Sequence, residues 1–138
     1  NVAEDFPAQR QWAMEILQRE SELQEIVQLV GSDALPDEQK MTLEVARMIR
    51  EIFLQQNAYH KVDTYCPMER QYTMMKLIRK FADLSTKAVE GGVAVDDIIA
   101  LPVRNRLAKS KYEEAIDSEL AAIDKEMADQ FDSLGDKA

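Results

Sequence analysis

The sequence contains little of what catalytic and metal sites require. Its one cysteine, Cys66, excludes an intrachain disulfide. Its one histidine, His60, is too few for a zinc site or for the two Glu-x-x-His pairs of a di-iron bundle. The four glycines are scattered and form no phosphate loop, and no serine lies in a hydrolase motif. We therefore expect no catalytic residue and no metal site, and a structural role for His60 and Cys66.

Long apolar segments and positive charge are also scarce. The longest apolar candidate, residues 98–101, is interrupted by Pro102, whereas a membrane span needs about 20 apolar residues. The chain has 17 basic against 26 acidic residues, a net charge of −9. Such a surface repels phosphate groups. We expect no nucleic-acid partner and no direct membrane insertion.

The remaining composition is that of a helical domain. Proline is tolerated at the first position of a helix, and glycine is favoured directly after the last one. Each of the four prolines precedes an amphipathic run, whereas Gly31 and the pair Gly91-Gly92 each follow one. This punctuation predicts four long helices, at residues 7–30, 36–57, 67–90 and 102–133, and a short fifth at 95–100.

The apolar spacing agrees with these helices. Residues three and four apart supply one apolar stripe per helix. The expected core includes Trp12, Ile16, Leu23, Ile26, Val27, Val30, Met41, Val45, Met48, Ile49, Ile52, Phe53, Tyr72, Met75, Leu77, Ile78, Phe81, Ala82, Leu84, Val103, Leu107, Ile116, Leu120, Ile123, Met127 and Phe131. No segment alternates with period two. We predict an all-α helical bundle over residues 1–132, with a disordered tail at 133–138.

Residues 29–40, LVGSDALPDEQK, form an acidic turn between the first two predicted helices. Asp37 and Glu38 favour the N-terminus of the second helix through its dipole, which is one sufficient reason for their presence. The turn is also the predicted tip of a helix hairpin, where it is free to contact a partner. A free-standing acidic bundle that works as an adaptor or scaffold is one protein class with these properties.

The stretch from this turn to Pro67, LVGSDALPDEQKMTLEVARMIREIFLQQNAYHKVDTYCP, resembles the C-terminal helical domain of the catalytic A subunit in archaeal-type and vacuolar-type rotary ATPases. The resemblance covers nearly the whole chain and is strongest at residues 45–67. The beta subunit of F-type ATP synthases has a similar acidic turn and a helix ending like Phe53-Leu54-Gln55-Gln56. This chain has Ala34 and Pro36 where the F-type turn has an acidic residue and a serine.

The resemblance implies a mechanical role. In this family the hairpin tip touches the central rotor stalk, coupling ATP synthesis or hydrolysis to rotation and ion transport. The implied rotor-contact residues are Asp33, Ala34, Leu35, Pro36, Asp37 and Glu38. The implied neighbours are the B subunits of the head and an upstream nucleotide-binding domain. The chain begins at Asn1 rather than methionine, and we expect it to be part of such a longer cytoplasmic subunit, peripheral to the membrane.

A second implied site is the adenine wall. F-type relatives place two aromatic residues, six apart, beside the adenine ring, and Tyr59 and Tyr65 have that separation. Tyr59 stands where the family commonly has phenylalanine. The alternative is that both are connector aromatics buried in this domain. Without an upstream phosphate loop, this chain alone is expected to bind no cofactor and to be inactive, whereas the parent subunit uses ATP or ADP with magnesium.

Overall fold

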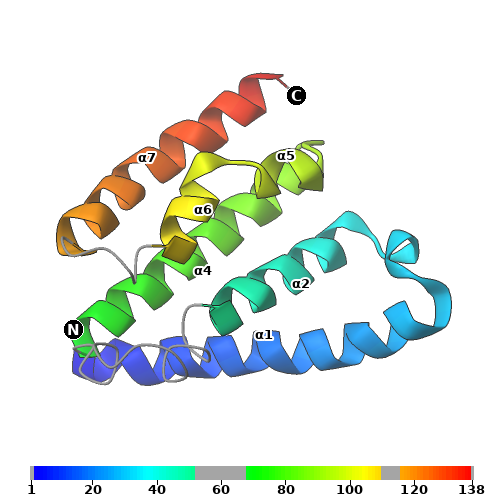
Figure 1. Ribbon diagram of the computed structural model, residues 1–138, viewed down its shortest axis with the longest axis horizontal. Helices are drawn as coiled ribbons and strands as arrows, with labels where there is room; N and C mark the ends of the chain where they lie inside the picture. Colours follow the sequence, from blue (N-terminus) through cyan, green and yellow to red (C-terminus); the bar gives the residue numbers. More distant parts are fainter. Residues whose placement is uncertain (1, 52–67, 110–115, 138) are drawn as a thin grey trace.

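The computed structural model describes residues 2–51, 68–109 and 116–137, and this part of the chain contains helices and no strand (Figure 1). The elements are α1 (Val2–Val30), the 3-10 turn η1 (Ser32–Ala34), α2 (Asp37–Ile49), α4 (Met68–Glu90), α5 (Val95–Ile99), α6 (Pro102–Lys109) and α7 (Ile116–Lys137). The predicted all-α class is confirmed. Within these ranges no helix is both long enough and apolar enough to cross a membrane.

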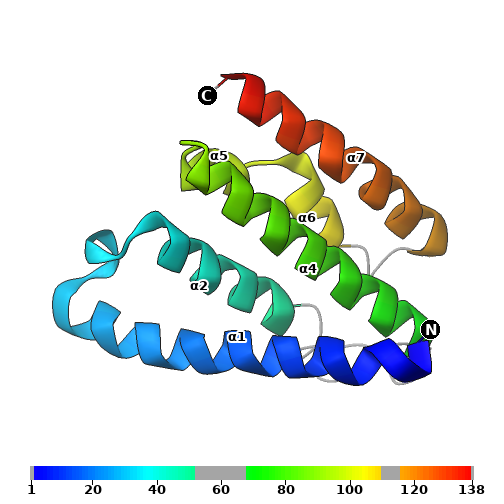
Figure 2. The same ribbon diagram turned by 180° about the vertical axis from the view of Figure 1, so that it is seen from behind.

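The helices are arranged around α4. Figures 1 and 2 show α1 and α7 on opposite sides of the molecule, with α4 between them. Helix α4 contacts α1, α2, α6 and α7, and the short α5 bridges α2 and α7. The two apolar sides of α4 therefore join the hairpin of α1 and α2 to the C-terminal helices.

The core follows from this central position. Phe81, Met74 and Ile78 of α4 are fully buried, and the Phe81 ring meets Phe131 of α7 edge to face, with centroids 5.3 Å apart. Fully burying each such side chain stabilises the fold by about 1.5–3 kcal/mol. The rest of the core comes mainly from α2, α6, α7 and the segment between α4 and α6, with Met41, Val45, Met48, Ile49, Val93, Val95, Ile98, Leu101, Val103, Leu107, Leu120, Ile123 and Met127. Most of the predicted core is confirmed.

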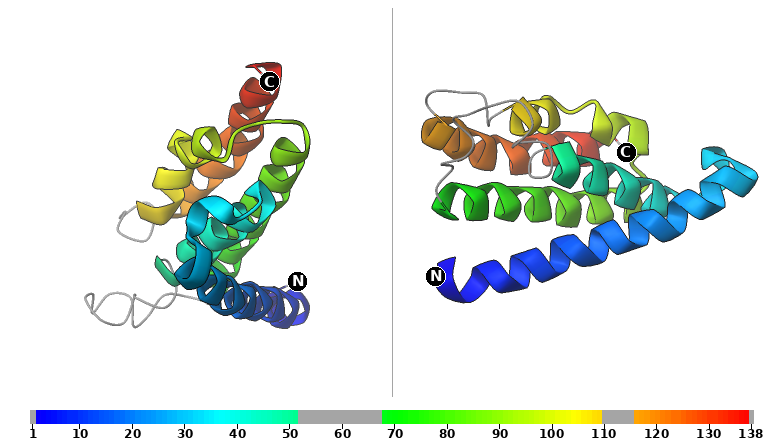
Figure 3. Two further views of the ribbon diagram at one scale, coloured as in Figure 1. Left: turned by 90° about the vertical axis from the view of Figure 1, so that its right-hand side faces the viewer. Right: turned by 60° about the horizontal axis from the view of Figure 1, so that its bottom comes forward.

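Two predicted core residues of the first helix lie outside. Ile26 and Val30 are 42% and 62% exposed, although both follow the apolar spacing of the sequence. The reason is that α1 extends beyond the helices that could cover its last turns. The right-hand view of Figure 3 shows this end of α1 projecting past the bundle.

Glycine ends α4 as the sequence predicts. Gly92 has φ +96°, and its N–H donates to the Val89 carbonyl, while the Val93 N–H donates to the Ala88 carbonyl, both at 3.0 Å. This is the Schellman arrangement, in which a left-handed residue satisfies the last carbonyls of a helix. The buried Val93 side chain then directs the chain back toward the core.

One predicted helix start is wrong by five residues, and a second differs by one. Helix α1 begins at Val2, so Pro7 lies inside it and not at its start. Proline has no N–H to donate to the carbonyl four residues earlier, so α1 lacks one backbone hydrogen bond at Pro7. Pro36 is the N-cap of α2, with ψ 155°, and α2 begins at Asp37.

The single helix predicted over residues 102–133 is also wrong. It is divided into α6, which ends at Lys109, and α7, which begins at Ile116. Arg106 pairs with Glu119 at 2.8 Å and also with Glu126, and in one continuous helix positions 106 and 126 would be about 30 Å apart. Folding α7 back places both apolar stripes on the same core, which a straight helix could not do.

The segment expected to be a disordered tail is helical as far as Lys137. Leu134 continues the helical spacing of Met127 and Phe131, and it packs against the core cluster. The gain from this apolar contact explains why the last turns of α7 extend beyond residue 132.

One buried ion pair fixes the hairpin to the C-terminal helices. Arg104 of α6 donates from Nε to Glu44 Oε1 of α2 at 2.8 Å, and its Nη2 lies 2.5 Å from the same oxygen. Both side chains are about nine-tenths buried. A second carboxylate, Glu51, lies 3.6 Å from Nη2. The guanidinium is thus neutralised inside the fold, where an unpaired charge would be costly.

Removing the buried acid should destabilise the fold strongly. We expect Glu44→Ala to lower the free energy of unfolding by about 3–5 kcal/mol, because Arg104 then loses its main counter-charge. Asp124→Ala is the control, since Asp124 pairs with Lys80 at 2.8 Å on the surface, and such pairs contribute about 0–1 kcal/mol. Urea unfolding measures both. Equal losses in the two variants would contradict the role of the buried pair.

Candidate functional site

The candidate site is the tip of the hairpin, which we define as residues 31–38. Helix α1 has 29 residues, so it is about 43 Å long, and the tip lies at the end opposite the N-terminus (Figure 1). Helix α2 returns along α1, and Arg50, the C-cap residue of α2, pairs with Glu20 of α1 at 2.6 Å. The contacts between these two helices make the hairpin a stiff arm with a free end.

The backbone of the tip is a sequence of tight turns. Gly31 ends α1 with φ +86°, and its N–H donates to the Val27 carbonyl at 2.8 Å. The Leu35 N–H then donates to the Ser32 carbonyl at 3.2 Å, which closes η1. Finally the Pro36 carbonyl accepts from Lys40, which opens α2. Each end of the turn is therefore fixed by a hydrogen bond or by a restricted backbone.

The six predicted contact residues do not have the same surroundings. Leu35 is buried, with 5% of its surface exposed, so it anchors the turn from beneath. The other five, Asp33, Ala34, Pro36, Asp37 and Glu38, are exposed. The surface that a partner could touch thus consists of three carboxylates and two small apolar residues.

The negative charge extends further than the sequence analysis recognised. Residues 20–39 contain six carboxylates, Glu20, Glu22, Glu25, Asp33, Asp37 and Glu38, and no lysine or arginine. Glu22 and Glu25 are exposed on the last turns of α1, beside the tip. The absence of lysine and arginine from residues 20–39 can be read from the sequence, and it would have indicated that these carboxylates belong to one acidic surface. Asp37 and Glu38 also lie in the first turn of α2, where the helix dipole favours them.

The second predicted site lies outside the described residues. Tyr59 and Tyr65 fall in the range 52–67, as do His60, Cys66 and the Phe53-Leu54-Gln55-Gln56 helix end. Among the residues that the structure describes, no group of three acidic, histidine or cysteine side chains is placed to hold a metal ion.

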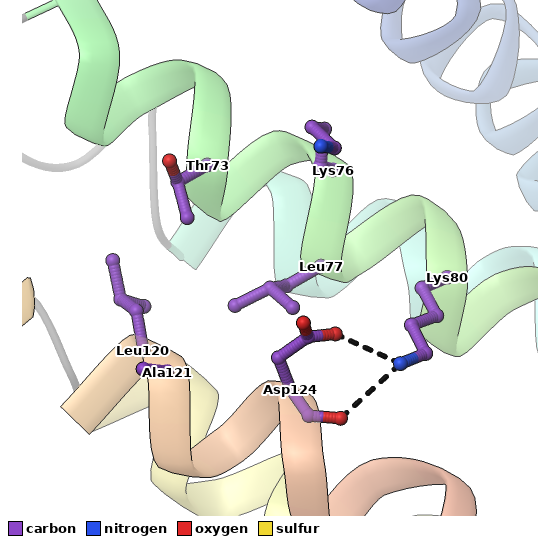
Figure 4. A pocket seen from close by; sticks show the side chains of 7 residues that line it. All are labelled: Thr73, Lys76, Leu77, Lys80, Leu120, Ala121 and Asp124. Carbon is purple, nitrogen blue, oxygen red and sulfur yellow. Dashed lines mark hydrogen bonds and ion pairs between the residues drawn. The ribbon is translucent and has the colours of Figure 1, made fainter. Parts of the chain in front are cut away.

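A groove of about 370 Å³ between α4 and α7 is an alternative candidate for the functional site (Figure 4). Lys80, one of the two lysines that line the groove, donates to Asp124 Oδ1 at 2.8 Å and to the Asp124 carbonyl at 3.1 Å. Lys76 lies 5.3 Å from the centre of the Tyr72 ring. Since Asp124 neutralises Lys80, the groove is a seam between two helices and holds no set of convergent polar groups for a ligand.

Comparison with known proteins identifies the family. Residues 1–99 match the family described as the C-terminal domain of V and A type ATP synthase, which is more than half of the chain. The chain belongs to this family.

Individual relatives agree. The chain is 54% identical over 133 residues to the A subunit of the A-type ATP synthase from Methanoculleus marisnigri, and 55% identical over 134 residues to the Methanosarcina barkeri protein of that name. It is 48% identical to that of Haloquadratum walsbyi. These matches cover 96–97% of the chain and 23% of each relative. The chain therefore corresponds to about a quarter of the A subunit of an ATP synthase, which favours this family over a free-standing adaptor.

The turn in this ATP synthase domain depends on one glycine. Gly31→Ala should lower the free energy of unfolding by about 1 kcal/mol, because φ +86° is unfavourable for a residue with Cβ. Gly135 in α7 is the matched control, since a Cβ there meets nothing within 4 Å. Gly135→Ala should raise the stability by up to about 1 kcal/mol. Urea unfolding of both variants gives the signs, and the same sign for both would contradict the constraint at Gly31.

Proposed function

We propose that the chain is the rotor-facing domain of the catalytic A subunit in a rotary ATP synthase or ATPase of the A/V type. The tip would press on the central stalk and so couple ATP synthesis or hydrolysis to rotation and ion transport. The observation that supports this most directly is a stiff hairpin whose exposed acidic tip lies about 43 Å from the N-terminus of the domain.

The length of α1 makes the hairpin an effective lever. An upstream nucleotide-binding domain would join at the N-terminus, opposite the tip. A rotation of about 10° at that end would move a tip about 43 Å away by about 7 Å. The base must stay rigid for this movement to reach the tip. The buried pair of Glu44 and Arg104 and the packing of α2 on α4 supply that rigidity.

The charge of the tip favours a basic surface on the stalk. Asp33, Asp37 and Glu38 are exposed, so salt and water screen their attraction to a partner. Such charges guide the approach and orientation of a partner more than they add affinity. A guiding contact suits a stalk that must keep turning, because no single ion pair holds it in one position.

The remaining partners lie in the parent complex. We propose that neighbouring B subunits flank this domain, and that the whole subunit is cytoplasmic and peripheral to the membrane. ATP or ADP and magnesium would bind upstream, where a phosphate loop is required. The described residues include no such loop and no metal cluster, so we assign no catalytic step to them.

Neutralising the tip should weaken coupling. In the full enzyme, the triple variant Asp33→Asn, Asp37→Asn, Glu38→Gln keeps the shape of the side chains and removes three charges. We expect ion transport per ATP hydrolysed to fall about two- to tenfold, an effect of roughly 0.4–1.4 kcal/mol, with an unchanged KM for ATP. Leu35 is left intact, because its burial would confuse loss of contact with loss of fold.

The control removes three exposed carboxylates from α4 and α7 by the changes Asp83→Asn, Asp129→Asn and Asp132→Asn. This variant has the same net charge as the tip variant and should couple normally. Normal coupling in the tip variant together with a raised KM would show that the tip serves nucleotide binding and not the stalk.

We also propose that Tyr59 and Tyr65 border the adenine ring in the parent subunit. The support is their spacing and the family to which the chain belongs. Stacking of an aromatic ring on a purine is worth about 1–3 kcal/mol per base. Tyr59→Ala should therefore raise the KM for ATP of the full enzyme about five- to hundredfold, and Tyr65→Ala should do so by a similar factor. Tyr59→Phe keeps the ring and is the control, and an unchanged KM in Tyr59→Ala would exclude this residue from the adenine site.

A further inference from the structure

The end of α1 carries an exposed apolar surface that the acidic turn does not explain. Leu29 is 85% exposed, Val30 62% and Ile26 42%. Leu29 and Val30 follow Ile26 by three and four residues, so the three side chains share one side of the last two turns of α1. We call these three residues the apolar ridge.

The apolar ridge differs from the single apolar residues that are commonly exposed on a protein surface. Among the side chains that the structure describes, the large hydrophobic ones that are exposed are Met14 and the three of the ridge. Three of these four therefore lie within five residues at the free end of one helix. Single exposed apolar residues are common, whereas a contiguous group bordered by polar residues is typical of an interaction surface.

The charges around the ridge indicate what covers it. On α1, Glu22 lies one turn before Ile26 and Glu25 directly precedes it, and the carboxylates of the tip follow the ridge. No lysine or arginine occurs between Arg19 and Lys40. Protein interfaces commonly have an apolar centre with a polar rim. A complementary partner would present apolar side chains in its middle and lysine or arginine at its edges.

We propose that the apolar ridge of Ile26, Leu29 and Val30 is the centre of the stalk contact, and that the acidic tip is its rim. The occupant is a surface of the stalk with apolar residues flanked by basic ones. This inference rests on the proposed function and deepens it, because it moves the main contact from the turn itself to the last two turns of α1.

The physical character of the contact supports this division. Apolar burial is non-directional and depends on the area removed from water. A patch of leucine, valine and isoleucine can therefore stay in contact while the stalk surface turns beneath it. Ion pairs with fixed hydrogen-bond geometry add specificity of orientation, which would resist turning. The ridge thus supplies adhesion, and the exposed carboxylates supply guidance.

Photocrosslinking in the assembled enzyme tests where the contact is. A photoreactive amino acid is placed at position 29 of the full-length protein, and in a second variant at position 34, on the exposed part of the tip. We expect both to crosslink to the stalk. Crosslinking from position 34 with none from position 29, or from position 29 to a different component of the enzyme, would overturn the ridge and leave the proposed function intact. No stalk crosslink from either position would overturn both.

Affinity measurements test what the contact is made of. Catalytic heads assembled with the double variant Leu29→Gln, Val30→Gln are titrated with the purified stalk protein in low and in high salt. We expect about tenfold weaker binding at both salt concentrations, because the lost interaction is apolar. Met14→Gln is the matched control, since it removes a side chain that is 65% exposed on the same helix, about 24 Å from Val30.

The salt dependence separates the ridge from its rim. Catalytic heads with the triple tip variant (Asp33→Asn, Asp37→Asn, Glu38→Gln) should bind the stalk more weakly than unmodified heads at low salt. At high salt the two should bind equally, because salt screens the lost charges. Unchanged binding by the Leu29 and Val30 double variant, or an equal loss with Met14→Gln, would overturn the ridge. Thermal unfolding of each variant protein confirms that these exposed substitutions leave the domain folded.

Discussion

The fold depends on the burial of α4 on two sides. Phe81, Met74 and Ile78 leave no surface exposed, and α4 contacts the hairpin on one side and α7 on the other. Without this helix the hairpin and the C-terminal helices would have little common core, since α5 supplies a short bridge between them. The apolar packing of α4 is therefore what joins the hairpin and the C-terminal helices into one domain.

This packing ends before the hairpin does. The base of the hairpin is fixed by Glu44 and Arg104, which are buried together between α2 and α6. The last turns of α1 receive no comparable cover, and Leu29 and Val30 remain exposed there. A rigid base with an uncovered end is the mechanical requirement for an arm that transmits movement. The same arrangement leaves apolar surface in the place where a moving partner would meet it.

The free end of the hairpin, made of the acidic tip and the apolar ridge, combines two interactions that differ in range. Carboxylates act over about 8–10 Å at physiological salt, and apolar side chains act at contact. In a rotary ATP synthase the first would orient the stalk and the second would hold it close while it turns. Because the chain belongs to the V- and A-type family, we interpret the two interactions as parts of the proposed stalk contact.

Much of the fold could be predicted because its signals are local. Gly31 and Gly92 adopt positive φ, which is a steric property of a residue without Cβ, and they end helices wherever the chain folds. The apolar periodicity likewise identified most of the core of α2, α4 and α7. The exposed acidic turn followed from the same punctuation. The family resemblance came instead from the residue-by-residue likeness of the stretch 29–67, and the comparisons confirm it.

What the sequence alone determined is the all-α class, most of the helices with their apolar faces, and the family. What the tertiary structure decided is which faces find a partner. Ile26 and Val30 have the spacing of core residues but lie beyond the reach of α2 and α4, whereas Glu44 and Arg104 look like surface charges but neutralise each other inside. The division between α6 and α7 has no glycine or proline to mark it, because it is imposed by two apolar stripes that must reach one core. Burial is a property of the assembled helices, so no single segment of the sequence contains it.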